Sequence, residues 1–141
     1  MKMKATLCAV SLVVLSACGG GGGGASQQVG QFIDDPVGGL SYSCVSASQT
    51  ITGTTDDQGH FNYLPGQTCS FKVGNVTLGT LKDIPSDGKV TPQDVAGVAR
   101  GATTAPSALA IAQFLQSLND GSTPGRIVIS PATSTLLASA P

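Results

Sequence analysis

Few residues of this chain have the types and the spacing that enzyme chemistry requires. The single histidine, His60, follows a predicted turn at Asp56–Gly59, where strand alternation places its side chain outward. The acid pairs Asp34–Asp35 and Asp56–Asp57 are adjacent in sequence, so their side chains point apart and neither pair predicts a general acid and base. The sequence has no phosphate-binding or dinucleotide-binding glycine motif and no cysteine–histidine spacing typical of zinc. We expect no catalytic residue, no cofactor and no metal site of this kind.

One acidic segment, residues 83–94, leaves a calcium site open. Counted as an EF-hand loop, it has Asp83 at position 1, Asp87 at position 5 and Asp94 at position 12. Position 3 is Pro85, which offers no side-chain oxygen, and the residues before the loop predict a strand instead of a helix. The stretch Thr91-Pro92-Gln93-Asp94 also has the pattern of a helix N-terminus, in which Asp94 caps the helix. Both roles for Asp94 remain open at this point.

The elements that would position these residues are mostly strands, because apolar and polar residues alternate along them. Strands are predicted over 40–45, 60–64, 68–73, 76–81 and 126–129, with turns at 56–59, 65–66 and 74–75. One helix is predicted from Thr91 to a stop at Gly101, and a second starts near Pro106 with an apolar stripe over 111–118. The pattern predicts a mainly β fold, a small antiparallel β-sandwich with one or two helices packed after the strands.

The N-terminus has the features of an export signal. Lys2 and Lys4 precede an uncharged, mostly apolar run over 5–17, which is too short to span a bilayer and suits a secretory signal peptide over 1–17. The sequence Leu-Ser-Ala-Cys at 15–18 resembles the lipobox of bacterial lipoprotein precursors. The resemblance implies a diacylglycerol thioether on Cys18, cleavage before it and acylation of the new N-terminus. A plain signal peptide followed by a chance cysteine is the alternative.

The glycines after Cys18 predict a tether. Residues 18–31 contain six consecutive glycines and no charge, and a flexible segment of this kind has a root-mean-square reach of about 20 Å. A β-rich domain is then expected over 32–141. In lipoproteins of the enterobacterial type, glycine at the position of Gly19 favours the outer membrane over the inner one. The resemblance therefore implies an exported protein that is lipid-anchored to the outer membrane, on its periplasmic or its cell-surface face.

Export has consequences for the remaining cysteines and for charge. Cys44 and Cys69 are a natural pair in an oxidising compartment, and alternation places both in an apolar strand face, beside Tyr42 and Phe71. We predict a Cys44–Cys69 disulfide, with two separate buried thiols as the alternative. Loss of residues 1–17 removes two of seven basic residues, so five face eight acids and the net charge becomes −3. Without a basic patch, we expect no nucleic-acid partner.

A second resemblance concerns the domain. The stretch TTDDQGHFNYLPG, residues 54–66, resembles a hairpin of transthyretin-like, carboxypeptidase-regulatory-type β-sandwiches. From Phe32 to Ile129 the chain is similar to an adhesin-like N-terminal module of proteobacterial surface lipoproteins, on the pieces FIDDPVGGLSYSC, TTDDQGHFNYLPGQTCSFKVGNVTLG, VTPQDV and IAQFLQSLNDG. The resemblance implies no catalytic motif. Because such proteins often continue much further, the resemblance leaves open whether the chain is truncated or frame-interrupted at Pro141.

Two classes of function follow. The first is a membrane-anchored, non-catalytic binding or structural module, with a protein partner at the cell surface or with a spacing role over a glycan. Its recognition would lie in the exposed loops predicted at 46–55, 56–60 and 83–89. The second is the N-terminal module of a small exported enzyme, such as a hydrolase. The scarcity of catalytic groups favours the first class, and no small-molecule substrate is identified.

Overall fold

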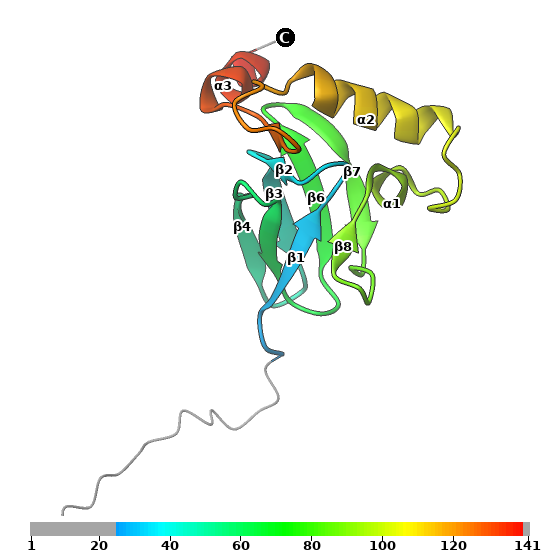
Figure 1. The fold of residues 1–141 in the computed structure, drawn as a ribbon. Helices are drawn as coiled ribbons and strands as arrows, with labels where there is room; N and C mark the ends of the chain where they lie inside the picture. The colour runs from blue at the N-terminus through cyan, green and yellow to red at the C-terminus, as the bar shows by residue number, and fades with distance from the viewer. Residues whose placement is uncertain (1–24, 140–141) are drawn as a thin grey trace, which may run out of the picture.

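Three sheets build the part of the chain that the computed structural model describes, residues 25–139 (Figure 1). The strands are β1 (Gln28–Phe32), β2 (Val37–Gly38), β3 (Ser41–Val45), β4 (Thr50–Thr54), β5 (His60–Tyr63), β6 (Thr68–Val73), β7 (Val76–Lys82), β8 (Lys89–Val90) and β9 (Ile127–Val128). The helices are α1 (Pro92–Ala96), α2 (Pro106–Ser117) and α3 (Pro131–Ser139). The predicted signal peptide and Cys18 lie outside the described residues.

The predicted mainly β architecture is confirmed. A four-stranded antiparallel sheet of order β4-β3-β6-β7 faces a three-stranded sheet of order β5-β1-β8, and β2 and β9 form a further pair. Two of the pairings, β1 with β8 and β2 with β9, are parallel, so the sandwich is not purely antiparallel. Parallel partners need a long crossover, and here each parallel pair joins strands that are far apart in the chain.

The core between the two larger sheets is built on aromatic rings. Phe32, Phe61 and Phe71 are all buried, and the ring centroid of Phe71 lies 5.1 Å from each of the other two rings in edge-on geometry. Strand alternation places them inward, as predicted for Phe61 and Tyr63. A Cβ at Gly30 would overlap the Phe61 ring. Glycine at this position of β1 therefore leaves room for the ring of Phe61, its partner residue on the neighbouring strand β5.

The start of β1 corrects one predicted boundary and marks one end of the sandwich. Strand β1 begins at Gln28, so residues 28–31, predicted as the end of the tether, belong to the three-stranded sheet. Gln28 pairs with Tyr63 at the end of β5. We call this the near end, which comprises Gln28, the turns at 46–49 and 64–67, and the loop 83–88 that follows Lys82. The far end is the opposite one, with the loops at 33–36 and 56–59 and, beyond them, β2, β9 and α3 (Figure 1).

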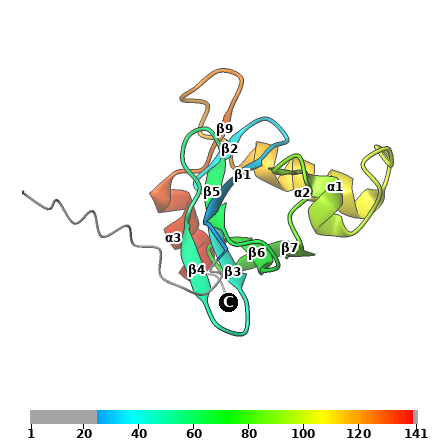
Figure 2. The same cartoon turned by 90° about the horizontal axis from the view of Figure 1, so that it is seen from below.

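The first two helices lie beside β7, as Figure 2 shows from below. Helix α1 has the predicted capping box: the Thr91 hydroxyl accepts from the Asp94 N–H, and the Asp94 carboxylate accepts from the Thr91 N–H. The predicted stop at Gly101 is wrong, because α1 ends at Ala96 with Gly97 in the left-handed conformation. The second helix starts at Pro106 as predicted, and its apolar stripe covers the core with Leu115 fully buried.

Five elements were not predicted, namely β1, β2, β4, β8 and α3. Helix α3 lies over the β6–β7 hairpin, where Asn75 Nδ2 donates to the Ala138 carbonyl at 2.6 Å. Gly74, at a φ of 57°, lies against the backbone of α3, where a Cβ would collide. Strand β4 occupies residues 50–54 of the predicted loop 46–55. It is an edge strand of threonines, with one partner and mostly exposed side chains, so it lacks the apolar alternation that reveals a strand.

Candidate functional site

A cleft of about 360 Å³ lies where the edge strands β4 and β5 approach each other, and we call it the edge cleft. Its lining residues are Val29, Tyr42, Thr54, Asp56, His60, Phe61 and Asn62. The rings of Tyr42 and Phe61 belong to the buried core, so they contribute little surface on which a ligand could stack. Polar side chains therefore dominate what the edge cleft offers to a ligand.

The Asp56 carboxylate organises the loop beside this cleft. Its Oδ1 atom accepts from the N–H groups of Gln58 and His60, both at 2.9 Å. Its Oδ2 atom lies 3.0 Å from His60 Nδ1. Desolvation works against ionisation, but these hydrogen bonds outweigh it and hold the pKa of Asp56 below its ordinary value. The carboxylate thus shapes the turn that carries His60, whose side chain lies on the outward side of β5 as predicted and is 42% exposed.

The chemistry of the edge cleft is that of hydrogen bonding. The Tyr42 hydroxyl accepts from the Asn62 N–H at 3.2 Å and is thereby engaged with the edge of β5. Within residues 25–139, the His60 imidazole hydrogen-bonds to the Asp56 carboxylate, and no serine, threonine or cysteine side chain hydrogen-bonds to it. A nucleophile activated by a histidine needs such a contact. Among the described residues, the edge cleft therefore offers hydrogen-bonding groups and a histidine paired with a carboxylate.

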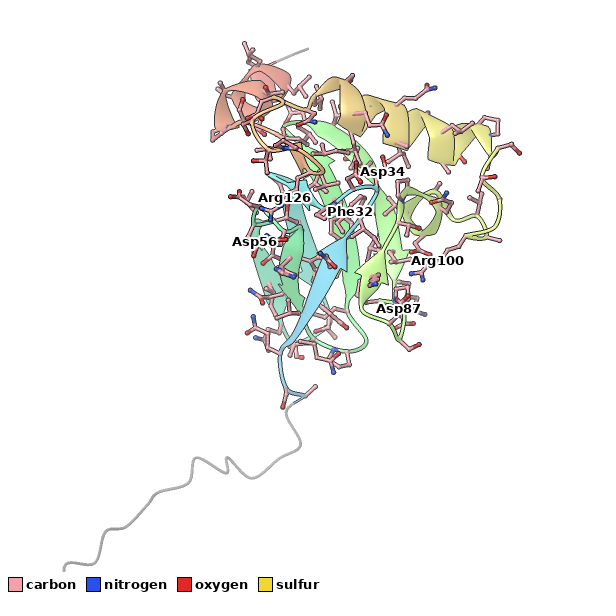
Figure 3. All side chains as sticks on the ribbon, in the orientation of Figure 1. Phe32, Asp34, Asp56, Asp87, Arg100 and Arg126 are labelled. Carbon is pink, nitrogen blue, oxygen red and sulfur yellow. A yellow bond between two sulfur atoms is a disulfide. The ribbon has the colours of Figure 1, made fainter. Side chains whose placement is uncertain are left out.

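Two of the three aspartates for which the sequence left a calcium site open, Asp87 and Asp94, bind an arginine. Arg100 Nη1 donates to Asp87 Oδ2 at 2.6 Å, and Nη2 donates to Asp94 Oδ2 at 2.9 Å and to the Lys89 carbonyl at 2.6 Å. Figure 3 shows Arg100 beside Asp87 at the α1 side of the molecule. No group of three or more acids, cysteines or histidines suited to a metal occurs in the described part of the chain. Asp83 takes no part in the Arg100 cluster.

The Arg100 cluster has clear electrostatic effects. Hydrogen bonds from Arg100 and from the Lys89 N–H lower the pKa of Asp87 to about 2. Partial burial of Asp94 works against ionisation, but hydrogen bonds from Arg100 and Thr91 outweigh it and lower the pKa of Asp94. Of the two roles that the sequence left open for Asp94, helix capping is the one that the structure has. Arg100 supplies the positive charge for both carboxylates.

The predicted disulfide is confirmed. Cys44 of β3 and Cys69 of β6 lie directly opposite each other in the antiparallel ladder, with an S–S distance of 2.02 Å. Both are fully buried in the core, beside Phe71 and Tyr42 as strand alternation predicted. The bridge joins neighbouring strands of one sheet, one residue pair away from the near end, where Val45 pairs with Thr68.

The three segments predicted to carry recognition do not form one surface. Thr54 and residues 56–60 border the edge cleft, whereas the turn at 46–49 and the loop 83–88 leave the sheets at the near end. Sequence reasoning missed Arg100, which is six residues from Asp94 and thirteen from Asp87. It also missed Arg126, which is beside Asp56 in Figure 3. With the Gln58 amide oxygen turned toward it, Arg126 Nη1 donates at 3.0 Å.

Comparison with protein-family models, with curated proteins and with solved structures found no match for this chain. The lipobox-like and transthyretin-like resemblances therefore rest on the motifs in the sequence alone. Function has to be inferred from those motifs together with the geometry described above.

Proposed function

We propose that the protein is an exported lipoprotein that holds a non-catalytic binding module beside the outer membrane through lipid on Cys18. The observation that carries the proposal is the lipobox-like sequence at 15–18, which ends ten residues before β1 begins at Gln28. The glycine-rich stretch between them has the composition of a flexible linker. No helix among residues 25–139 is long and apolar enough to cross a bilayer.

The binding role is supported by the division between engaged and available groups. The carboxylates of Asp56, Asp87 and Asp94 are bound to their own loops or to Arg100. The rim of the edge cleft offers the side chains of Thr54 and Asn62 and the exposed His60 ring. These are neutral hydrogen-bonding groups on loops and strand edges, where binding sites often lie. We propose a protein partner at the cell surface that contacts this rim.

A second candidate, the module of an exported hydrolase, is favoured by one observation, the Asp56–His60 pair beside a cleft. The two candidates differ in a measurable way. Screening the purified domain against ester, peptide and glycoside substrates should give no turnover. Reproducible turnover that disappears in His60→Gln would favour the hydrolase over the binding module.

The anchor is tested by intact mass of the protein extracted from membranes. We expect loss of residues 1–17 and a lipid adduct on Cys18. The Cys18→Ser variant should lose the adduct and leave the detergent phase, while Cys8→Ser, a matched change within the predicted signal peptide, should keep both. An unmodified Cys18 at a free amino terminus would contradict the lipoprotein proposal.

A further inference from the structure

We infer that the near end of the sandwich is a membrane-facing surface that rests on the bilayer through uncharged turns and two exposed valines. The inference rests on the proposed anchoring at Cys18 and names the surface that the anchored domain presents to lipid. It assigns different roles to loops that the sequence analysis treated alike. The turn at 46–49 faces lipid, and residues 56–60 face away from it.

The near end has the composition of a surface that can meet lipid headgroups. No charged residue occurs in Gln28–Val29, in residues 45–50 or in residues 64–67. The loop 83–88 leaves the same end after Lys82, and its two aspartates are balanced in number by Lys82 and Lys89. The two uncharged turns lose no charge hydration when they approach a bilayer. Two of the four large apolar side chains exposed within residues 25–139 are here, Val29 at 61% exposure and Val45 at 46%. Val29 projects from the outer face of the three-stranded sheet and Val45 from the outer face of the four-stranded sheet, so the two side chains flank this end from opposite sides.

The near end is also preformed. The buried Gln67 side chain accepts from the Leu64 N–H at 2.8 Å and donates to the Gln49 carbonyl at 3.1 Å, so one amide joins both turns. The Tyr63 hydroxyl donates to Gln28 Oε1 at 2.9 Å and fastens the start of β1 to the end of β5. The surface therefore meets the bilayer without having to order its loops first.

The length of chain before β1 makes this orientation the accessible one. As the predicted glycine-rich tether, the ten residues from Cys18 to Gln28 would have a root-mean-square span of about 17 Å. A domain of this size has a radius of gyration of about 13 Å and hence a diameter of about 35 Å. The near end is therefore held within one tether length of the lipid, whereas the far end reaches it only if the domain inverts.

Charge opposes the inverted orientation. The far-end loops and the turn beside β5 carry five of the eight aspartates, namely Asp34, Asp35, Asp56, Asp57 and Asp120. Arg126 is the one basic residue in the loops at 33–36, 56–59 and 119–126. Inversion would bring this net negative surface toward anionic headgroups, which repel it. Tether length and charge thus select the same face.

The test uses the chain from Cys18 to Pro141, with Cys18 coupled to a maleimide lipid in small bicelles that contain anionic lipid. Because Cys44 and Cys69 are joined, Cys18 is the thiol available for coupling. A paramagnetic headgroup lipid should abolish the amide NMR signals of residues 46–49 and 64–67, while the signals of α3 keep most of their intensity. Equal loss at both ends, or greater loss on α3, would overturn the inference.

Variants separate lipid contact from tethering alone. The double variant Val29→Asp, Val45→Asp should recover much of the lost near-end intensity, because two charges then face anionic lipid. Leu136→Asp, at a side chain with 71% exposure on α3, is the matched control and should leave the pattern unchanged. An unchanged pattern in the double variant would rule out contact through the valines. Failure of lipidation in cells would appear separately as unmodified Cys18, because the coupling here is chemical.

Discussion

At each end of the sandwich, one buried polar side chain bridges two backbone segments. The two ends differ in how easily water could replace the hydrogen bonds of that side chain. At the far end, the Thr55 hydroxyl accepts from the Leu40 N–H at 3.0 Å and donates to the Val37 carbonyl at 2.7 Å, and both bonds are buried. At the near end, the Gln67 amide joins Leu64 and Gln49 through bonds that are only partly buried.

The difference reflects how much regular pairing each end has. The near end is the edge of long ladders, in which β3 pairs with both β4 and β6 over five residues. The far end depends on β2 and β9, which are two residues each and pair only with one another. A short pair leaves backbone groups without a ladder partner, and a hydroxyl inside the protein has to satisfy them. The far end should therefore tolerate loss of its polar side chain less well.

The strongest way to weaken the near end is to remove its disulfide. Cys44 and Cys69 are 25 residues apart, and a loop of that length predicts a loss of about 3.5 kcal/mol of unfolding free energy in Cys44→Ala, Cys69→Ala. Denaturant unfolding by circular dichroism measures the loss, with the reduced natural chain as the control. A double variant as stable as the oxidised chain would show that the bridge contributes nothing to the folded sheet.

The corresponding change at the far end is Thr55→Val, which keeps the shape and removes the hydroxyl. It leaves the buried Leu40 N–H and Val37 carbonyl without their partner, so we expect a loss of about 2 kcal/mol. Thr54→Val, one residue earlier on an exposed side chain, is the matched control and should change little. Equal stability of the two variants would mean that water reaches the far end after all.

At the near end, Gln67→Met tests a side chain that is itself buried but whose hydrogen bonds are only partly buried. The partners left behind, the Leu64 N–H and the Gln49 carbonyl, lie close to solvent and can bind water. We therefore expect a loss of about 1 kcal/mol, smaller than for Thr55→Val. Hydrogen exchange should show faster opening of residues 46–49 and 64–67 in this variant. A loss larger than that of Thr55→Val would reverse the proposed order of the two ends.

The long paired strands were easier to predict from the sequence than the segments at the two ends of the sandwich. Strict alternation in residues such as Phe61 and Tyr63, and the Gly74–Asn75 turn, predicted strands and a hairpin that the structure contains. Strand β1 was missed because its apolar residues are separated by glycine and glutamine and follow a glycine-rich run. Its place in the sheet depends on the distant partners β5 and β8, which local sequence does not reveal.

The candidate site was predictable in its residue types and not in its contacts. The exposed His60, the capping role of Asp94 and the Cys44–Cys69 pair follow from local pattern and parity. The ion pairs of Arg100 do not, because a loop between α1 and α2 has to fold back to bring its guanidinium to Asp87. Two of the three acids with this EF-hand-like spacing, Asp87 and Asp94, do come together in the folded chain. The cation between them is the Arg100 guanidinium, which only the tertiary structure reveals.

The smallest expected effect is a change in the pKa of one carboxylate, and it again compares the two ends of the sandwich. Asp56 belongs to the far-end turn and is bound by its own loop, whereas Asp87 lies in the loop that leaves the near end after Lys82 and depends on Arg100. Arg100→Gln should raise the pKa of Asp87 from about 2 toward its ordinary value and leave the lowered pKa of Asp56 as it is. Carboxyl-detected NMR titration measures both groups in one sample.

The sign of the accompanying change in stability follows from the direction of these shifts. A carboxylate whose pKa is lower in the folded state stabilises the fold above its unfolded pKa, and this contribution is lost as the pH falls through its folded pKa. For Asp87 that loss falls between about pH 4 and about pH 2. The natural chain should therefore lose slightly more stability over this window than Arg100→Gln does, because the variant has less of this contribution to lose. Since Asp87 is exposed, the difference should be small and should shrink further in high salt. A titration of Asp87 that is the same in both proteins would show that the Lys89 N–H, and not Arg100, holds the carboxylate ionised.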